Sequence, residues 1–448
     1  MRTEQAADDS NTSKFGMLPS ASIESLIIID REIDFATVLL TQLTYEGLID
    51  EMFGVKYNQA EIDLSIVGPA PGAQQSGKSV GAPQQQGLKR KIQLDSSDKL
   101  YEQLRDANGA IVDSLLNKVA RRLQNDMKSK NAESISELRD FVGKLPGYQS
   151  EQQSLKIHIN LTEEIMKNTQ GDIFRRSLEV QQNLYDGSDP SYQHDTIEEL
   201  ISRDIPLTTV LRLLCLESCI SGGLRQKDLD NFKRLILHAY GYQHLLTLNA
   251  LEKMGLLSTR ASANVLMNPL GVGGATAEGT KTNYNYLRKV LRLVVDEVNE
   301  QNPNDIAYVY SGYAPLTVRL VQSLIQKQHL LTITKGASAA SNGVGSAAHG
   351  WQGFEDALRN IKGETFNKVQ KGDESAVKAR HMLAGAGGKV KTVVVMFLGG
   401  ITFTEIAALR FVARQEEGRR QILICTTDVI NGSRMMDAAI ETRDFGKG

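Results

Sequence analysis

The sequence predicts an α/β domain that is discontinuous: its mostly parallel sheet is assembled from both ends of the chain, and a large all-α segment is inserted between them. Three short, unbroken apolar runs at 25–31, 391–398 and 421–427 have the pattern of strands covered on both faces of a sheet. Because one strand alone is not stable, we expect the first run to pair with the two distant runs. Apolar helix-forming segments follow the first two runs and end at Phe53 and Gln415, as expected for strand–helix units.

Composition and hydrophobic pattern divide the chain into regions. The segments that lie outside the predicted elements are polar or rich in Gly, Pro, Gln, Ala and Ser, and such segments bury too little apolar surface to fold. The predicted regions are a disordered lead-in at 1–22, the first part of the α/β domain at 23–56, a low-complexity spacer at 57–94, a helical domain at 95–333 with a disordered loop at 259–282, a Gly/Ala-rich spacer at 334–389 with a short helix at 354–361, and the second part of the α/β domain at 390–448.

Apolar residues at helical spacing predict a series of helices in the inserted segment. Pro146 lies between two of them. Proline lacks a backbone donor and disfavours helical geometry in the preceding residue, so we expect Pro146 to separate two helices. The predicted helices are 97–127, 134–145, 148–168, 169–184, 206–220, 227–240, 243–254, 283–299 and 317–328, with an irregular aromatic segment at 306–316 before the last.

The charges of the chain are balanced, with 51 Lys and Arg against 53 Asp and Glu and a formal net charge of −2. This balance provides no overall positive field for nucleic acid or anionic lipid. The longest apolar run, 392–401, contains two glycines and is shorter than the roughly 18 residues of a membrane span. Three cysteines, an odd number, indicate free thiols in a reducing compartment. We therefore expect a soluble cytoplasmic protein without a membrane span that does not bind nucleic acid.

The stretch from Gly72 to Ser79 matches the P-loop pattern of nucleotide-binding proteins. In a P-loop the glycines cradle phosphates between a buried strand and the start of a helix. Here Pro69 and Pro71 precede the match, and a Gly/Pro/Gln-rich stretch follows it, so neither flanking element is predicted. We interpret the match as a coincidence in a linker, and a P-loop NTPase is kept only as an alternative function.

The remaining polar residues form no catalytic set. Cys215 and Cys219 are one helical turn apart, but a zinc site needs further ligands, and the chain has no CxxC or HExxH motif. Asp30 and Asp34 are interpreted as the end of a strand and the cap of the next helix, not as an acid pair. The sequence therefore predicts no catalytic, metal-binding or cofactor-binding residue, and we do not expect an enzyme.

Several long motifs resemble the SM family, the Sec-one/Munc-eighteen-like proteins that chaperone the SNAREs of membrane fusion. LIIIDREIDFATVLLTQLTYEGLIDEMFG at 26–54 is similar to the signature of the family's second domain, and FLGGITFTEIAALR at 397–410 is similar to its closing signature. LPGYQSEQQSLKIHINLTEEIMK at 145–167 resembles the SNARE-engaging helical hairpin of the third domain. Within the family, 41–51 and 298–320 are most similar to the members that act in vacuolar protein sorting.

The resemblance implies a regulator of SNARE-mediated fusion that templates SNARE assembly at the vacuole or late endosome. It implies a subunit of the HOPS and CORVET tethering complexes that reaches the membrane only through its partners. Partner helices held in register on a surface lose less freedom when they assemble into a bundle. The alternative is a purely structural tether subunit without SNARE contact. The SNARE-binding residues that the hairpin match implies are Pro146, Tyr148, Leu155, Ile159, Glu163 and Met166.

Two features of the hairpin bear on this expectation. The predicted helix 148–168 carries apolar residues on more than one side, and the second side either contacts SNAREs or packs on a neighbouring helix. Pro146 matches the hinge proline of the family hairpin, which bends back or extends to meet a SNARE helix. A fixed turn without switching is the alternative.

The resemblance also implies a partner subunit, vacuolar protein sorting sixteen, which docks on the distal third domain. Its contact motif matches Tyr284, Leu287 and Arg288. We expect an exposed aromatic anchor there, so Tyr284→Asp should abolish co-purification and leave the melting temperature nearly unchanged. The alternative is that Tyr284 merely starts a helix. SM proteins begin with a further α/β domain, and none precedes Ile23. We therefore expect a fragment or a truncated gene model, in which the cleft for closed syntaxin is incomplete.

Overall fold

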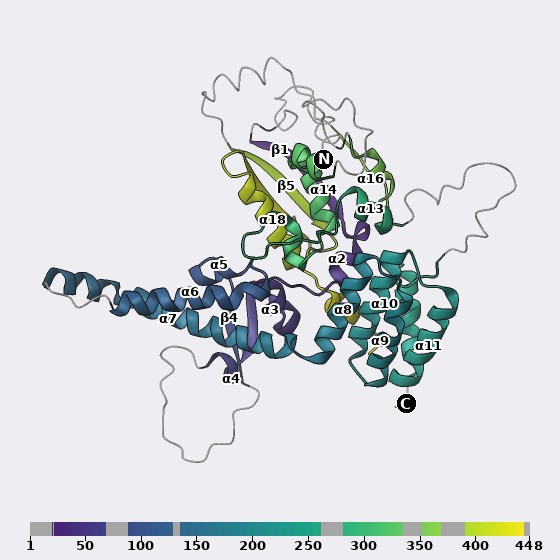
Figure 1. Ribbon diagram of the computed structural model, residues 1–448, viewed down its shortest axis with the longest axis horizontal. Coiled ribbons are helices and arrows are strands. Elements are labelled where there is room, and N and C mark those ends of the chain that lie inside the picture. Colours follow the sequence, from purple (N-terminus) through teal and green to yellow (C-terminus); the bar gives the residue numbers. More distant parts are fainter. Residues whose placement is uncertain are drawn as a thin grey trace, which may run out of the picture.

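The computed structural model describes residues 20, 22–68, 88–128, 135–260, 281–334, 351, 353–368 and 390–442, and for 126–128 and 135–146 it describes the helical backbone alone. Most of the predicted lead-in, loop and second spacer therefore lies outside the described residues. In Figure 1 the parallel sheet and the helices beside it form the upper part of the molecule, and an array of helices lies to the right. A long helical arm, formed by the helices at 109–128 and 135–169, projects to the left.

The two ends of the chain form one parallel sheet. Strands β1 (Ile23–Asp30), β5 (Lys391–Leu398) and β6 (Arg420–Thr426) pair in the order β1-β5-β6, so β5 lies at the centre. Ile27 of β1 is in register with Val395 of β5. The predicted pairing of the first apolar run with two distant runs is confirmed.

The parallel sheet is buried on one face and open on the other within the described residues. Val393 and Val395 are buried in the core, and helix α18 (Phe403–Gln415) follows β5 beside the sheet (Figure 1). Leu26 and Ile28, on the opposite face of β1, are 60% and 59% exposed. The prediction that the strands are covered on both faces is therefore wrong for β1 in this part of the chain.

Two aspartates organise the turn after β1. Asp34 accepts hydrogen bonds from the backbone N–H of Thr37 at 3.0 Å and from its hydroxyl at 2.6 Å, and so caps helix α2 (Phe35–Leu39). Asp30 ends β1 and caps the 3-10 helix η1 (Arg31–Ile33). Both roles agree with those predicted from the sequence.

A second sheet lies where the sequence predicts a spacer. Strands β2 (Val55–Lys56), β3 (Gln59–Asp63) and β4 (Lys89–Gln93) form an antiparallel sheet, and helix α4 (Leu64–Val67) follows β3. The prediction of a spacer at 57–94 is therefore wrong at both ends of that range. The strands are short, and few apolar residues alternate with many charged ones, so their period of two is weak in the sequence. The buried members are Val55, Ala60, Ile62 and Ile92.

The helices of the insertion mostly follow the prediction. Helix 97–127 is divided near Asn108, whose side chain accepts from the N–H of Ala110 at 3.0 Å, and helices α9 and α15 were not predicted. The predicted short helix at 354–361 is confirmed in part. The elements are α3 (Tyr45–Phe53), α5 (Lys99–Leu104), α6 (Gly109–Lys128), α7 (Ile135–Thr169), α8 (Asp172–Asp186), α9 (Ser191–Ser202), α10 (Leu207–Ser221), α11 (Gln226–Tyr240), α12 (His244–Lys253), α13 (Tyr284–Val290), η3 (Ile306–Tyr310), α14 (Leu316–Ile325), α15 (Lys327–Thr334), α16 (Glu355–Arg359) and α19 (Gly432–Asp437).

Helix α7 continues through Pro146 without a break. The prediction that Pro146 separates two helices is therefore wrong. A proline in a helix interior destabilises it by about 3 kcal/mol, because one hydrogen bond is lost and the ring crowds the preceding turn. A break would leave several backbone groups of both new helix ends without partners. Since helix-forming sequence lies on both sides, one lost bond is the smaller disruption.

Helix α13 ends earlier than predicted. The sequence predicts a helix over 283–299, but the helix ends at Val290 and Arg292 adopts a φ of 48°, in the left-handed region that L-residues rarely occupy. Beyond it, Val294 forms an antiparallel bridge with Tyr313. The apolar residues after 290 are therefore buried by a loop that pairs with the aromatic segment, and not by a helical stripe.

The buried residues form two clusters that do not coincide with the predicted domains. The larger cluster contains the buried face of the parallel sheet together with α8 to α14. The smaller contains α3, the antiparallel sheet, α5, α6 and the C-terminal half of α7. Helix α3, which the sequence assigns to the α/β domain at 23–56, therefore packs with the helical arm. The change of core occurs between Leu40 and Tyr45.

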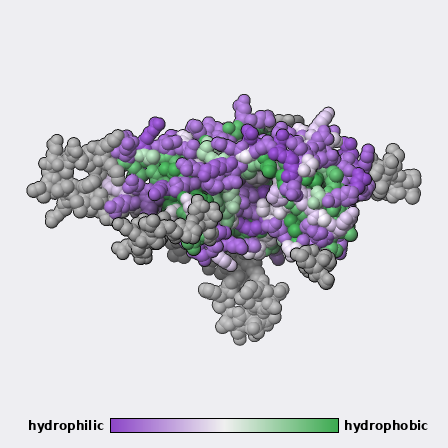
Figure 2. Space-filling model, turned by 90° about the horizontal axis from the view of Figure 1, so that it is seen from below, coloured by the Kyte–Doolittle hydropathy of each residue, from purple (hydrophilic) through white to green (hydrophobic). Residues whose placement is uncertain are grey.

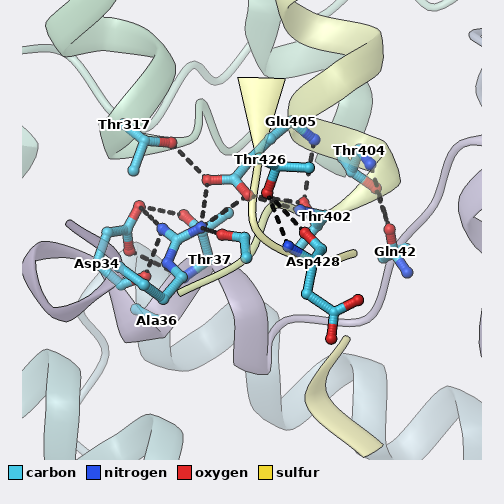
Figure 3. A network of polar contacts seen from close by, with 12 residues as sticks. Asp34, Ala36, Thr37, Gln42, Thr317, Thr402, Thr404, Glu405, Thr426 and Asp428 are labelled. Atoms are coloured by element: carbon cyan, nitrogen blue, oxygen red, sulfur yellow. Dashed lines mark hydrogen bonds and ion pairs between the residues drawn. The ribbon is translucent and has the colours of Figure 1, made fainter. Parts of the chain in front are cut away.

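A buried ion pair joins the two ends of the chain. Arg31 is 3% exposed and donates to both carboxylate oxygens of Glu405 at 2.9 Å and to the carbonyl oxygen of Asp34 at 2.7 Å. Burial opposes the charge on Arg31, but Glu405 and Asp34 outweigh it and raise the pKa of the guanidinium. Glu405 also accepts from the backbone N–H of Thr402 at 2.9 Å, which completes the capping box of α18, and from the hydroxyl of Thr317 at 2.5 Å (Figure 3).

Replacing Arg31 by methionine should destabilise the protein strongly. Arg31→Met would leave the carboxylates of Glu405 and Asp34 buried without their cation, which typically lowers the free energy of unfolding by about 3–5 kcal/mol. The neighbouring substitution Glu32→Gln removes only the half-exposed ion pair with Lys362, so it should change stability by less than about 1 kcal/mol. Urea unfolding monitored by circular dichroism tests both, and equal stability of the two variants would contradict the assignment.

His194 should contribute stability in acid and lose that contribution in alkali. Its Nε2 lies 3.1 Å from both carboxylate oxygens of the buried Glu217, and although burial opposes protonation, this carboxylate raises the pKa of His194. A raised folded-state pKa gives stability that is complete below the unfolded value of about 6.5 and is lost as the pH rises through the folded pKa. His194→Gln should therefore lower the melting temperature more at pH 6 than at pH 9. Burial lowers the pKa of His244, so His244→Gln should not show this acid-specific loss.

Candidate functional site

Helix α7 is anchored along its C-terminal half and exposed before it. The side chains of 149–152 are exposed, whereas Leu155, Leu161 and Ile165 are buried. The buried side packs against α3, α5 and α6 and on the short helix α4. The second apolar side of this helix therefore serves in part to pack on its own domain, which was one of the two alternatives that the sequence left open.

A buried histidine fixes the anchored half of α7. His158 is 1% exposed, and its Nδ1 lies 2.8 Å from the hydroxyl of Tyr45 while its Nε2 lies 3.2 Å from a carboxylate oxygen of Asp98. The ring of Tyr101 stacks on the imidazole with centroids 6.0 Å apart. Ser154 donates to the same carboxylate. Burial opposes ionisation of Asp98, but His158 and Ser154 hold its pKa well below the usual range.

Polar contacts continue from this histidine to the C-terminal half of the sheet domain. The hydroxyl of Tyr101 donates to Glu46 at 2.7 Å, and Arg410 of α18 donates to Glu46 at 2.9 Å and to Asp106 at 2.8 Å. Burial raises the pKa of Glu46 despite these donors. The root of α7 is therefore tied through α3 and α5 to α18.

A groove of about 600 Å³ runs between α7 and the second sheet. Asn160 of α7 donates to the carbonyl oxygen of Ile66 at 2.7 Å, which fixes α7 against α4. Figure 2 shows the molecule from the side on which α4 lies in Figure 1: the surface is mostly hydrophilic, with separate hydrophobic areas. The groove is lined by Val67, Gly68, Arg90, Gln149, Gln152, Gln153, Leu155, Lys156, Ile157 and Ile159.

The predicted hairpin residues divide into groove-lining, exposed and buried positions. Leu155 and Ile159 line the groove, the first almost completely buried and the second half-buried. Glu163 is exposed, and Tyr148 and Met166 are half-buried. Pro146 lies on the helical backbone of α7, in the part whose side chains are not described. All six lie on one continuous helix, and their contact with SNAREs stays a prediction.

The structure contradicts the expectation that Tyr284 is an exposed anchor. Tyr284 is 6% exposed, and its hydroxyl donates to Asp34 at 2.5 Å and lies 3.4 Å from the backbone nitrogen of Ala36. Burial raises the pKa of Tyr284 well above its usual value. The tyrosine therefore holds the turn after β1 against α13, and the expectation that Tyr284→Asp spares the melting temperature is wrong.

Only part of the predicted tether-binding motif reaches the surface. Leu287 is completely buried, and half-buried Arg288 donates to the carbonyl oxygen of Tyr185 at 3.2 Å. The outward side of α13 presents Tyr286, which is 36% exposed, and Lys289. A partner that contacts α13 would meet these two residues first.

The described residues contain no group of three or more His, Cys, Asp and Glu side chains placed to hold a metal ion. Cys215 is buried and Cys219 lies in the same helix; burial raises the pKa of both thiols, which keeps them protonated. The P-loop match from Gly72 to Ser79 lies outside the described residues. No helix in the described ranges is long and apolar enough to cross a membrane.

The sequence analysis missed the second wall of the groove and the histidine at its root. Val67 and Arg90 lie in the range interpreted as a spacer. The alternation of Ala60 and Ile62 with charged neighbours is the signal that predicts a strand there. Nothing in the sequence pairs His158 with Asp98, because these residues are 60 positions apart and meet only through the packing of α5 on α7.

Substitutions on the two sides of α13 should separate stability from partner binding. Tyr284→Asp places a second carboxylate beside buried Asp34 and should lower the free energy of unfolding by about 3–5 kcal/mol, whereas Tyr284→Phe loses one hydrogen bond and about 1–3 kcal/mol. Tyr286→Asp makes the same chemical change on the outer side and should leave the unfolding midpoint in urea within about 0.5 kcal/mol of wild type. A wild-type-like midpoint for Tyr284→Asp would contradict the buried assignment.

Comparisons with known proteins agree with these features. The model of the Sec1 family matches residues 2–438. The vacuolar protein sorting-associated protein 33A of Rattus norvegicus is 38% identical over 93% of this chain and 62% of its own length. The vacuolar protein-sorting-associated protein 33 homolog of Arabidopsis thaliana is 34% identical over 94% of this chain and 62% of its own length. This chain therefore spans about 62% of the length of these two relatives.

Solved structures show the same fold at low sequence identity. The SM protein Vps45 in complex with the Qa SNARE Tlg2 has a TM-score of 0.57 at 15% identity and covers 98% of this chain and 62% of that chain. The Unc18–syntaxin 1 complex from Monosiga brevicollis has a TM-score of 0.54 at 13% identity and covers 98% of this chain and 63% of that chain. The family resemblance seen in the sequence is therefore confirmed: the chain belongs to the Sec1 family, the family of the SM proteins.

Proposed function

We propose that this chain regulates SNARE-mediated membrane fusion by holding SNARE helices on α7. Membership of the Sec1 family supports this proposal, and two solved structures with the same fold are SM proteins in complexes with a SNARE or syntaxin. The observation that carries it is the geometry of α7: a 35-residue helix that the buried His158 anchors near the middle of its described side chains and that is exposed at 149–152.

The physical basis is templating. Bringing separate helices together costs translational and conformational entropy, and a rigid surface that orients one helix reduces that loss for the next. A long helix offers contacts at intervals of three and four residues to a parallel neighbour. The ties from His158 through Tyr101 and Glu46 to Arg410 keep the anchored half of α7 in one orientation.

The finer proposal places this activity at the vacuole or late endosome, in the HOPS and CORVET tethering complexes. The names of the relatives, vacuolar protein sorting-associated proteins, support a vacuolar role. In this proposal the subunit called vacuolar protein sorting sixteen contacts the outer side of α13, through Tyr286, Lys289 and the exposed part of Arg288, and membrane association is peripheral and depends on partners. Co-purification with that subunit should be lost in Tyr286→Asp and retained in Tyr192→Asp, which alters an exposed tyrosine of α9.

Two rival functions are separated by simple binding experiments. A purely structural tether subunit would co-purify with its partner but retain no SNARE motif in pull-downs. A P-loop NTPase would bind nucleotide, and Lys78→Ala would abolish that binding in calorimetry. Members of the Sec1 family are non-enzymatic regulators of SNAREs, so the enzyme is the less favoured rival.

Replacing Pro146 should strengthen SNARE engagement if the proline loosens α7. Pro146→Ala restores a backbone donor and removes about 3 kcal/mol of local helix destabilisation, so the extended helix should be more populated. We expect faster assembly of SNARE motifs in a fluorescence assay and tighter retention in pull-downs. Gly147→Ala, at a position where an added Cβ meets nothing within 4 Å, should give a smaller increase in the same direction. Unchanged affinity and assembly rate in a folded Pro146→Ala protein would show that no hinge operates.

A further inference from the structure

A buried threonine of α7 has no hydrogen-bond partner for its hydroxyl among the described residues. Thr162 is 4% exposed and lies one helical turn after His158, on the same side of α7. A buried hydroxyl without a partner is destabilising, so its presence calls for an explanation. Tyr45 of α3 connects the two residues: its hydroxyl lies 2.8 Å from Nδ1 of His158, and although burial raises the pKa of Tyr45, the neighbouring hydroxyl of Thr162 acts in the opposite direction.

The donors and acceptors around His158 define the form of its ring in neutral solution. Burial opposes the charge of Asp98, but its hydrogen bonds hold its pKa well below the usual range, so the carboxylate is ionised. The ring nitrogen Nε2, 3.2 Å from this carboxylate, therefore carries a hydrogen and donates it. A neutral imidazole then has a bare Nδ1, which accepts from the hydroxyl of Tyr45. Because Tyr45 has one hydroxyl hydrogen, Thr162 receives none.

A second proton on the ring changes the hydrogen bonds without moving any ring. With a proton from solvent on Nδ1, this nitrogen donates to the oxygen of Tyr45, and the hydroxyl hydrogen of Tyr45 turns to the oxygen of Thr162. The unpartnered hydroxyl thereby gains a partner, and the hydrogen bond to Asp98 becomes an ion pair. The positive ring also lies over the face of Tyr101, with the two planes inclined by 12°.

The charges around the imidazole favour this second form. Asp98, the N-cap of α5, is an anion in direct contact with the ring. Tyr45 of α3 and Tyr101 of α5 stay neutral, because burial raises the pKa of both phenols. Behind Tyr101 lies Glu46, which is paired with Arg410 of α18. Burial of the ring itself opposes the added charge.

We propose that His158 is a pH-sensitive switch that holds the root of the helical arm more firmly in mild acid. When Nδ1 takes up a proton, one more hydrogen bond, from Tyr45 to Thr162, and one ion pair, to Asp98, connect α7 with α3 and α5. Histidine is the side chain whose charge ordinarily changes between about pH 5 and pH 8. The switch acts on the anchored half of α7 whatever partner the arm meets, so it goes beyond the proposed function.

The first measurement observes the ring directly. In the full chain with isotope-labelled histidine, long-range proton–nitrogen correlation spectra distinguish the Nε2–H form from the doubly protonated ring. The chain has seven histidines, and the signal of His158 is identified by its loss in His158→Gln or by its shift in Thr162→Val. We expect the Nε2–H form at pH 8 and the doubly protonated ring at pH 6. A ring that stays neutral at pH 6, or that carries its hydrogen on Nδ1 at pH 8, would overturn the proposal.

The second measurement tests the part played by Thr162. Thr162→Val removes the hydroxyl with little change of shape. At pH 8 it deletes an unpartnered group, so the unfolding equilibrium constant in urea should equal that of wild type or be smaller. At pH 6 it leaves the hydroxyl of Tyr45 without an acceptor, so the constant should be at least threefold larger than that of wild type.

A matched control makes the same chemical change elsewhere on α7. Thr169 lies at the end of this helix and donates to a carbonyl oxygen of the preceding turn, so the effect of Thr169→Val should be equal at pH 6 and pH 8. His194 is present in all three proteins, and its own pH dependence therefore cancels in the comparison. If the cost of Thr162→Val does not increase toward pH 6, or if Thr169→Val shows the same increase, no switch operates at this histidine.

Discussion

The buried contact between Arg31 and Glu405 is the interaction on which the arrangement of this chain depends. The two residues are 374 positions apart, and closing so long a loop costs about 5 kcal/mol in chain entropy on a logarithmic estimate. Glu405 sits in the first turn of α18, where it also caps that helix, and Arg31 begins the turn after β1. One carboxylate therefore fixes the N-terminal strand, the C-terminal helix and, through Thr317, a helix of the insertion. Because Arg31 and Glu405 are almost fully buried, removing one of them leaves the charge of the other buried without an opposite charge.

The same principle operates at the root of the helical arm. His158 and Glu46 are buried polar residues that make hydrogen bonds to residues of other helices. Each of them therefore fixes two packed helices to one another. Arg410 lies on α18, the helix that Glu405 begins, and contacts Glu46 on α3. Helix α18 is thus one of the connections between the sheet domain and the arm, beside the contacts of Asp50 with Asn431 and of Glu51 with Arg212. A surface on α7 can act as a template only if its orientation relative to the rest of the molecule is fixed. The hydrogen bonds of His158, Glu46 and Arg410 provide that constraint.

How much of this was predictable depends on whether the signal is local. The apolar runs that form β1, β5 and β6 and the capping role of Asp34 were read correctly, because strand composition and helix capping act over a few residues. The family motifs covered the same segments and indicated the same fold. The antiparallel sheet was missed because its strands are short and highly charged, and they are stabilised by packing on α3 and α4 instead of by their own composition.

The errors at the candidate site have the same origin. Tyr284 matched an interface motif, yet its hydroxyl is bound to Asp34, a residue 250 positions away whose proximity no local pattern records. The motif match gives the residue types of an interface, but it does not show whether those side chains are exposed in this chain. At Pro146 the local signal is correct but is overridden. Proline favours the end of a helix, yet the helix-forming sequence on both sides keeps α7 continuous through this residue.

The groove beside α7 depends on structure that the sequence pattern did not predict. One wall is a helix that the family motif identified, and the other is a pair of short elements assigned to a spacer. A helix by itself offers contacts along one line only. The second wall adds Val67, Gly68 and Arg90 to the lining, so α7 becomes one side of a groove only together with β4 and α4.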